Sequence, residues 1–118
     1  MSPPLSDKKI ISLVAKKENL PGNFIRRGIA SGEMVITRNT CRPSVKNFTP
    51  LAIGRGLKTK INANIGTSPY SVSIERELEK LQVAISAGAD AVMDLSTGGN
   101  LDKIRRAIIG ASAVSVGT

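Results

Sequence analysis

Two asparagines on one expected strand are the first residues whose type and spacing point to chemistry. Asn62 and Asn64 stand at alternate positions near the end of the segment 60–65, and alternate residues of a strand share one face. Asparagine is depleted in strands, and its amide group both donates and accepts hydrogen bonds. The pair is therefore a candidate ligand-binding surface, and it is equally typical of a turn beginning at Gly66.

A second expected strand, residues 91–95, also ends in a polar residue. The sequence Val92-Met93-Asp94 places a carboxylate near the carboxyl end of this strand, beside a glycine-containing turn. Asp94 could orient a substrate amine, act as a base, or pair with Lys60 on the neighbouring strand. A structural ion pair or cap is an equally good interpretation of Asp94, and a methionine such as Met93 is more often part of a core than a ligand contact.

The turn after the second strand precedes an expected helix. Its sequence, Ser96-Thr97-Gly98-Gly99, would expose backbone amides that can hold a phosphate at the amino terminus of a helix. The sequence matches neither the P-loop nor the dinucleotide-binding fingerprint. A plain turn is therefore the preferred interpretation.

Composition excludes several kinds of catalytic site. The chain has no histidine and a single cysteine, Cys41. Histidine-based acid–base catalysis, catalytic triads and histidine-ligated metal are excluded, and so is an internal disulfide framework. An iron–sulfur cluster generally takes three or more cysteines, so this chain cannot hold one alone.

From residue 58 onward the hydrophobic pattern alternates between strand and helix. Strands are expected over residues 60–65, 91–95 and 113–116, with a helix in each interval. The order β-α-β-α-β indicates a parallel sheet with right-handed crossovers. Three strands cannot close a barrel, so this α/β segment is either a small open sheet or the opening of a (β/α)8 barrel. Composition does not choose between the two.

Capping residues predict where the two helices begin. The first helix carries apolar residues at spacings of four, three and four, namely Ile74, Leu78, Leu81 and Ile85. Ser73 can cap this helix and Gly88 can end it. Glu75 and Glu77 in its first turn suit the positive end of the helix dipole. Asn100 can cap the second helix.

The amino-terminal third is expected to be helical. Asp7 can cap a first helix, and Asn23 can cap a second over residues 24–30. Residues 34–37 form a short β-branched run, and residues 38–50 follow as a polar connector with two prolines.

Charge is distributed unevenly along the chain. The net charge is +8: residues 1–60 hold 12 Lys/Arg and 3 Asp/Glu, giving +9, whereas residues 61–118 hold 5 and 6, giving −1. A basic first half could attract nucleic acid, an anionic membrane or phosphorylated metabolites, although a solvated basic face is the preferred interpretation. No aromatic platform interleaves the basic residues, which argues against nucleic acid as a partner. Without a signal peptide or a run of about 20 apolar residues, we expect a cytoplasmic protein that does not enter the membrane.

Several longer segments are more specific than these local patterns. They are Lys60-Ile-Asn-Ala-Asn-Ile-Gly-Thr-Ser68, Glu77-Leu-Glu-Lys-Leu81, Ala87-Gly-Ala-Asp-Ala-Val-Met-Asp-Leu-Ser-Thr-Gly-Gly99, Ile29-Ala-Ser-Gly-Glu-Met-Val-Ile36 and Ile53-Gly-Arg-Gly-Leu57. Together they closely resemble the amino-terminal portion of the phosphomethylpyrimidine synthase family of thiamine biosynthesis, and the resemblance covers nearly the whole chain.

The resemblance implies a radical enzyme of the carbon–carbon lyase class. Members use a 4Fe-4S cluster to cleave S-adenosylmethionine, and the resulting radical rearranges aminoimidazole ribonucleotide into hydroxymethylpyrimidine phosphate. The resemblance also implies a (β/α)8 barrel and a homodimer. Matched position by position, Asn64 and Met93 fall on substrate-binding positions, and Asn62 and Asp94 flank them. No catalytic residue and no metal ligand is carried over to this chain.

The chain also departs from the family. It ends at Thr118, where the family continues into a Val-Pro-Ile-Tyr segment, and it lacks the later substrate contacts, the metal-binding histidines and the three-cysteine cluster motif. We therefore expect a truncated chain that is inactive alone and binds neither cluster nor S-adenosylmethionine. Residues 1–50 would be an amino-terminal helical and connector region, and residues 51–118 the first two βα units and third strand of an incomplete barrel.

A non-catalytic function is the alternative hypothesis. The basic first half could make the chain a binding module for RNA or for a partner protein. An unfinished parallel sheet leaves a strand edge open to pairing, which favours self-association into a homo-oligomer.

Overall fold

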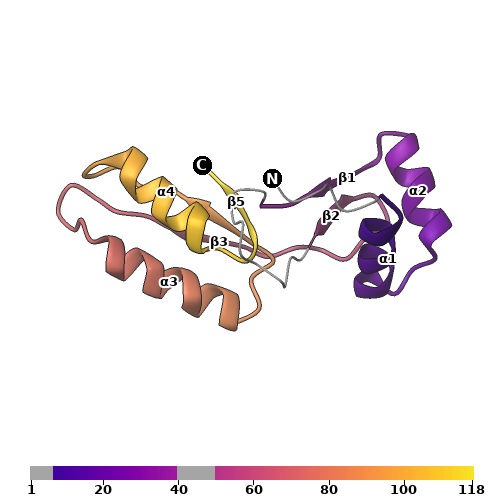
Figure 1. Cartoon of the computed structure of the whole chain (residues 1–118), viewed down its shortest axis with the longest axis horizontal. Helices are drawn as coiled ribbons and strands as arrows, with labels where there is room; N and C mark the ends of the chain where they lie inside the picture. Colours follow the sequence, from indigo (N-terminus) through magenta and orange to yellow (C-terminus); the bar gives the residue numbers. More distant parts are fainter. Residues whose placement is uncertain (1–6, 40–49) are drawn as a thin grey trace. The chain divides into compact units, whose positions relative to one another are not determined.

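The structure, a computed structural model, describes residues 7–39 and 50–118, which form two compact units (Figure 1). The first unit contains residues 7–38 and 50–59, and the second contains Asn39 and residues 60–118. The division differs from the predicted boundary after residue 50, because the residues that follow it pack with the amino-terminal region. Most of the predicted connector, including Cys41, lies outside the described residues.

The first unit packs two helices against a two-stranded antiparallel sheet. Its elements are α1 (Asp7–Glu18), α2 (Gly22–Ala30), β1 (Met34–Thr37) and β2 (Leu51–Gly54). Met34 pairs with Gly54, and Thr37 pairs with Leu51. The buried core joins all four elements through Val14, Ile25, Met34 and Ala52.

The predicted Asn23 cap of α2 is wrong, because the helix begins earlier in the chain. The Pro21 carbonyl accepts hydrogen bonds from the amides of Phe24 (3.0 Å) and Ile25 (3.4 Å), so the first turn already includes Gly22. Asn23 therefore lies inside this turn, where its Oδ1 accepts a hydrogen bond from Nη1 of Arg26 (3.1 Å).

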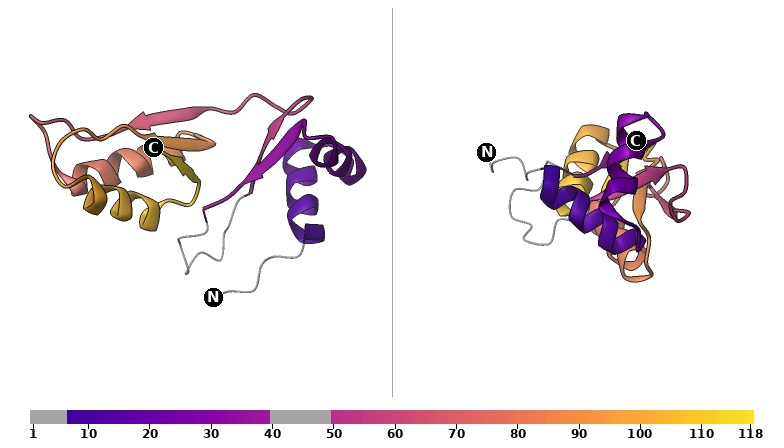
Figure 2. Two further views of the ribbon diagram at one scale, coloured as in Figure 1. Left: turned by 90° about the horizontal axis from the view of Figure 1, so that it is seen from above. Right: turned by 90° about the vertical axis from the view of Figure 1, so that its right-hand side faces the viewer.

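The second unit is a β-α-β-α-β arrangement. Its elements are β3 (Asn62–Ile65), α3 (Ile74–Ser86), β4 (Ala91–Asp94), α4 (Leu101–Ala111) and β5 (Ser115–Gly117). The three strands are parallel in the order β3-β4-β5, as predicted, and α3 and α4 lie together on one face of the sheet (Figure 2). The core between helices and sheet contains Ile65, Leu81, Val92, Ile104 and Ile108.

Both predicted caps of the second unit are confirmed. The Ser73 hydroxyl accepts a hydrogen bond from the Arg76 amide at the start of α3 (3.3 Å). The side chain of Asn100 accepts one from the Lys103 amide at the start of α4 (3.0 Å).

Within residues 7–39 and 50–118, no helix has the length and apolar character needed to cross a bilayer.

Strand β3 is shorter than the predicted segment 60–65. The Ile61 carbonyl accepts hydrogen bonds from the amides of Asp90 (2.9 Å) and Ala91 (3.2 Å). The Ile61 amide donates to a carboxylate oxygen of Asp90 (2.9 Å) rather than to a strand. The regular ladder of hydrogen bonds between β3 and β4 therefore begins at Asn62. Asp90, just before β4, binds the backbone of Ile61, just before β3.

Candidate functional site

The face of the three-stranded sheet turned away from α3 and α4 carries small and polar residues together with one methionine. The parallel register arranges them in two rows: Asn64, Met93 and Gly117 form one, and Asn62, Ala91 and Ser115 form the other. The opposite face carries the aliphatic residues that contact the helices, because strand side chains alternate between faces. The face turned away from the helices, which we call the polar face, therefore lacks the aliphatic residues that form the core between helices and sheet.

Asn64 and Met93 lie side by side on this face. They are register partners in neighbouring strands, with Asn64 exposed and Met93 half-buried. The Met93 thioether extends over β5, since a Cβ atom at Gly117 would lie only 3.0 Å from Met93 Cε and 3.1 Å from its sulfur. The row thus presents an amide next to a flexible, polarizable apolar group.

Asp94 does not share this face. It alternates with Met93, so its carboxylate points to the side covered by the helices and is 1% exposed. One carboxylate oxygen accepts hydrogen bonds from the amide (3.0 Å) and the hydroxyl (2.5 Å) of Ser96. The other oxygen lies 3.8 Å from Nε of Arg105 on α4. Asp94 therefore lies on the other side of the sheet from the two asparagines, and its contacts match the cap and ion-pair interpretation.

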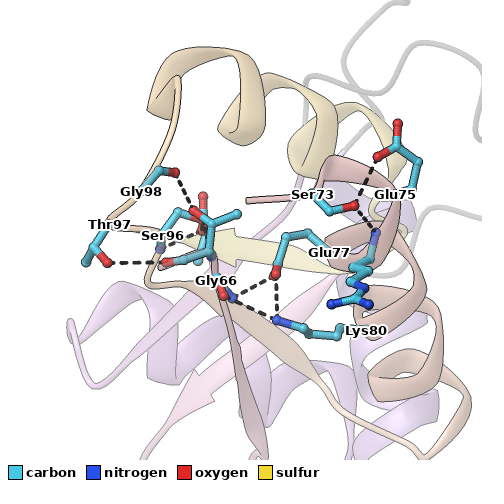
Figure 3. A network of polar contacts seen from close by, with 11 residues as sticks. Gly66, Ser73, Glu75, Glu77, Lys80, Ser96, Thr97 and Gly98 are labelled. Carbon is cyan, nitrogen blue, oxygen red and sulfur yellow. Dashed lines mark hydrogen bonds and ion pairs between the residues drawn. The ribbon is translucent and has the colours of Figure 1, made fainter. Parts of the chain in front are cut away.

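The loops that follow β3 and β4 are hydrogen-bonded to each other (Figure 3). The Thr67 amide donates to the Ser96 hydroxyl (3.1 Å), and the Thr67 hydroxyl donates to the Gly98 carbonyl (2.6 Å). In return, the Thr97 amide donates to the Thr67 carbonyl (2.9 Å). Two amides of the candidate phosphate site are thus bonded within the protein, that of Thr97 to Thr67 and that of Ser96 to Asp94, which favours its interpretation as a turn.

A sequence model of the radical SAM ThiC family matches residues 6–118. The chain belongs to the radical SAM ThiC family.

Curated relatives of this ThiC-family chain are phosphomethylpyrimidine synthases. The protein of Desulforamulus reducens is 56% identical over 105 residues, which cover 89% of this chain and 24% of the relative. The protein of Syntrophus aciditrophicus is 51% identical over 108 residues, covering 92% and 25% of the two chains. That of Thermodesulfovibrio yellowstonii is 55% identical over 105 residues, covering 89% and 24%. The chain thus spans about a quarter of the length of the curated relatives it matches.

The family match confirms the predicted resemblance. It does not test the roles of single residues, so substrate binding by Asn62, Asn64, Met93 and Asp94 stays a prediction. The structure brings the first three of these to one face and places Asp94 behind it.

The residues of this chain do not fit the iron–sulfur cluster of the ThiC family. The sequence contains one cysteine and no histidine. In the part of the chain that the structure describes, no three Cys, His, Asp or Glu side chains converge on a point that could hold a metal ion. A cluster held by cysteine thiolates therefore cannot be assigned to these residues.

Sequence reasoning missed the side chains that support the ends of the strands. Glu77 was noted only as an acid in the first turn of α3, yet it is 2% exposed. A signal was present, because Glu77 is three residues after Ile74 and four before Leu81, which places it on the apolar face of the helix. Thr67 and Ser96, each 4% exposed, carried no comparable signal.

Proposed function

We propose that this chain supplies the opening quarter of a phosphomethylpyrimidine synthase and that its polar sheet face forms part of the pocket for aminoimidazole ribonucleotide. The observation that carries the proposal is the row of Asn64 and Met93 on the face turned away from the helices, in a chain of the radical SAM ThiC family. The reaction is that of its curated relatives, which are phosphomethylpyrimidine synthases.

The polar face suits a small heterocyclic substrate. The amide of Asn64 can donate to and accept from ring nitrogens or an exocyclic amine. Met93 offers a polarizable contact to the face of a ring, and its thioether lies over Gly117 of β5, where no side chain displaces it. Asn62 lies one row further from the strand ends, on the same face. Asp94 would act from behind the face by holding the Ser96 loop.

In the complete protein, we propose that the second unit is the opening of a (β/α)8 barrel. Its strands are parallel and its two helices cover a single face, as the outer ring of helices does in such a barrel. The polar face would then point to the barrel interior, and the carboxyl ends of β3 and β4 would lie at the end of the barrel where active sites are found.

The cluster and S-adenosylmethionine would be bound by the part of the enzyme beyond these 118 residues, since this chain has one cysteine. The isolated chain would accordingly form no product. Its cytoplasmic location and its homo-oligomeric state stay predictions.

A fusion enzyme tests the proposal. This chain would replace the matching quarter of the Desulforamulus reducens synthase, and the fusion and the isolated chain would each be incubated with S-adenosylmethionine, a reductant and aminoimidazole ribonucleotide. We expect pyrimidine product from the fusion and none from the isolated chain. Product from the isolated chain would contradict the assignment of the cluster and S-adenosylmethionine to the rest of the enzyme.

The role of Asn64 has its own test in the fusion. Asn64→Ala should raise KM for aminoimidazole ribonucleotide about 2- to 10-fold, the range for losing one neutral hydrogen bond. The control is Gln82→Ala, which removes an exposed amide from α3. An unchanged KM in the Asn64→Ala fusion would refute the substrate-binding role.

A further inference from the structure

Two side chains of α3 bind both polar atoms of one backbone residue at the end of β3. The Gly66 amide donates to Oε2 of Glu77 (2.7 Å), and the Gly66 carbonyl accepts a hydrogen bond from Nζ of Lys80 (3.2 Å). Glu77 and Lys80 are themselves joined by an ion pair between Oε1 and Nζ (2.5 Å). Figure 3 shows this closed ring of three residues, which we name the Gly66 clamp.

The clamp acts where the ends of the two strands come closest. A Cβ atom at Gly66 would lie 2.6 Å from the carbonyl carbon of Leu95 and from the Ser96 amide nitrogen. No side chain fits there, and the backbone of Gly66 has a φ of +152°, which favours glycine. Glycine allows this close contact, but its backbone is conformationally permissive. Neighbouring residues must therefore hold the Gly66 peptide in its orientation.

The position of Gly66 matters because Asn64 is two residues before it. The ladder continues past the strands, with the Leu95 amide donating to the Ile65 carbonyl (2.8 Å). A rotation of the Gly66 peptide would therefore move the last residues of β3 against β4. The row formed by Asn64 and Met93 is the one nearest to this end.

The burial of Glu77 shows that it is more than a helix-stabilising acid. Its side chain is 3% exposed, whereas Glu75 and Glu79 on the same helix are exposed to solvent. Burying a carboxylate is unfavourable unless its oxygens are hydrogen-bonded and its charge is paired. Among the residues that the structure describes, Gly66 and Lys80 are the partners through which Glu77 meets both conditions, so its burial depends on the clamp.

We propose that Glu77 and Lys80 are positioning residues for the substrate. By fixing the Gly66 peptide, they set the orientation of Asn64 beside Met93 at the mouth of the pocket. This inference rests on the proposed function, because it gives the clamp a purpose only if Asn64 binds substrate.

The first test uses the full 118-residue chain and nuclear magnetic resonance. Lys80→Met removes the half-exposed member of the clamp, and Lys80→Arg keeps a cation that can reach both partners. We expect Lys80→Met to speed hydrogen exchange of the Gly66 amide about 10-fold and to shift the side-chain amide signals of Asn64. Lys80→Arg should restore both readouts, and the control Glu79→Gln should leave them unchanged.

A second variant covers the buried member of the clamp. Glu77→Gln keeps an oxygen for the Gly66 amide but removes the charge that pairs with Lys80, so it should give the same Asn64 shift with a smaller rise in Gly66 exchange. Unchanged Gly66 exchange and Asn64 signals in both Lys80→Met and Glu77→Gln would overturn the inference.

The second test measures kinetics in the fusion enzyme. Lys80→Met should raise KM for aminoimidazole ribonucleotide about 2- to 10-fold, with little change in kcat and none in KM for S-adenosylmethionine. Added to Asn64→Ala, it should cause less than a twofold further change, because the clamp acts through Asn64. An unchanged KM in Lys80→Met, alongside a raised KM in Asn64→Ala, overturns this inference and leaves the proposed function standing. An unchanged KM in Asn64→Ala overturns the proposed function itself.

Discussion

Replacing Gly66 with alanine should destabilise the second unit more than the same replacement at Gly88. Both glycines have positive φ, +152° and +97°, so alanine at either is strained by about 1–3 kcal/mol. At Gly88 nothing lies within 4 Å of the added Cβ atom. At Gly66 the Cβ atom would lie 2.6 Å from the backbone of Leu95 and Ser96, and relieving such overpacking costs about another 1–3 kcal/mol. We therefore expect a loss of about 2–6 kcal/mol for Gly66→Ala.

Urea unfolding of the two variants measures this difference. Methyl signals of Leu81 and Ile108, both in the core of the second unit, report on that unit alone. The free energy of unfolding comes from linear extrapolation, with the slope compared between variants to check that the transition is unchanged. Gly88→Ala serves as the control for backbone strain. Equal losses in the two variants would refute the close contact between the ends of β3 and β4.

Three further predictions concern single side chains of the second unit. Leu81→Ala should lower its free energy of unfolding by about 2–5 kcal/mol, because Leu81 is fully buried, whereas Val83→Ala, at a residue 68% exposed, should change it by less than about 0.5 kcal/mol; urea unfolding measures both. The pKa of Glu75 is held below its ordinary value chiefly by a hydrogen bond from the Glu75 backbone amide and secondly by one from the Ser73 hydroxyl. Ser73→Ala should therefore raise this pKa, as measured in a carboxyl titration by nuclear magnetic resonance. Because the pKa is lowered in the folded state, the stability that Glu75 contributes is present above the ordinary pKa and is lost as pH falls through the folded one; an unmoved Glu75 titration in Ser73→Ala would contradict this. Asp94→Asn should cost about 1–3 kcal/mol in the same unfolding assay, since it weakens buried hydrogen bonds made to a charged group.

The parallel sheet and its helices could be predicted because their signals are local. Ser73 and Asn100 each stand directly before an apolar periodic segment, and both cap as expected. Strand β2, in contrast, was not predicted. It is four residues long and exists through pairing with β1, more than ten residues earlier in the chain, a contact that no local pattern encodes.

The candidate site was predicted in part. The side-by-side placement of Asn64 and Met93 follows from two parallel strands with matching ends. The side of the sheet on which Asp94 lies was not predicted, although strand alternation indicates it. Once Val92 is buried against the helices, a residue two positions later must lie on the same side. The Gly66 clamp depends on the three-dimensional approach of α3 to β3, which spacing alone did not reveal.

The most direct test of the central claim follows the methyl group of Met93 in the fusion enzyme. With methionine methyl groups labelled with carbon-13, the Met93 signal can be assigned by its loss in a Met93→Leu variant. Met34, buried in the core of the first unit, provides an internal reference. Aminoimidazole ribonucleotide, added without S-adenosylmethionine, should shift the Met93 signal and leave that of Met34 in place. A Met93 signal that stays fixed at saturating substrate, in a fusion that still forms product, would contradict the assignment of this sheet face to the substrate pocket.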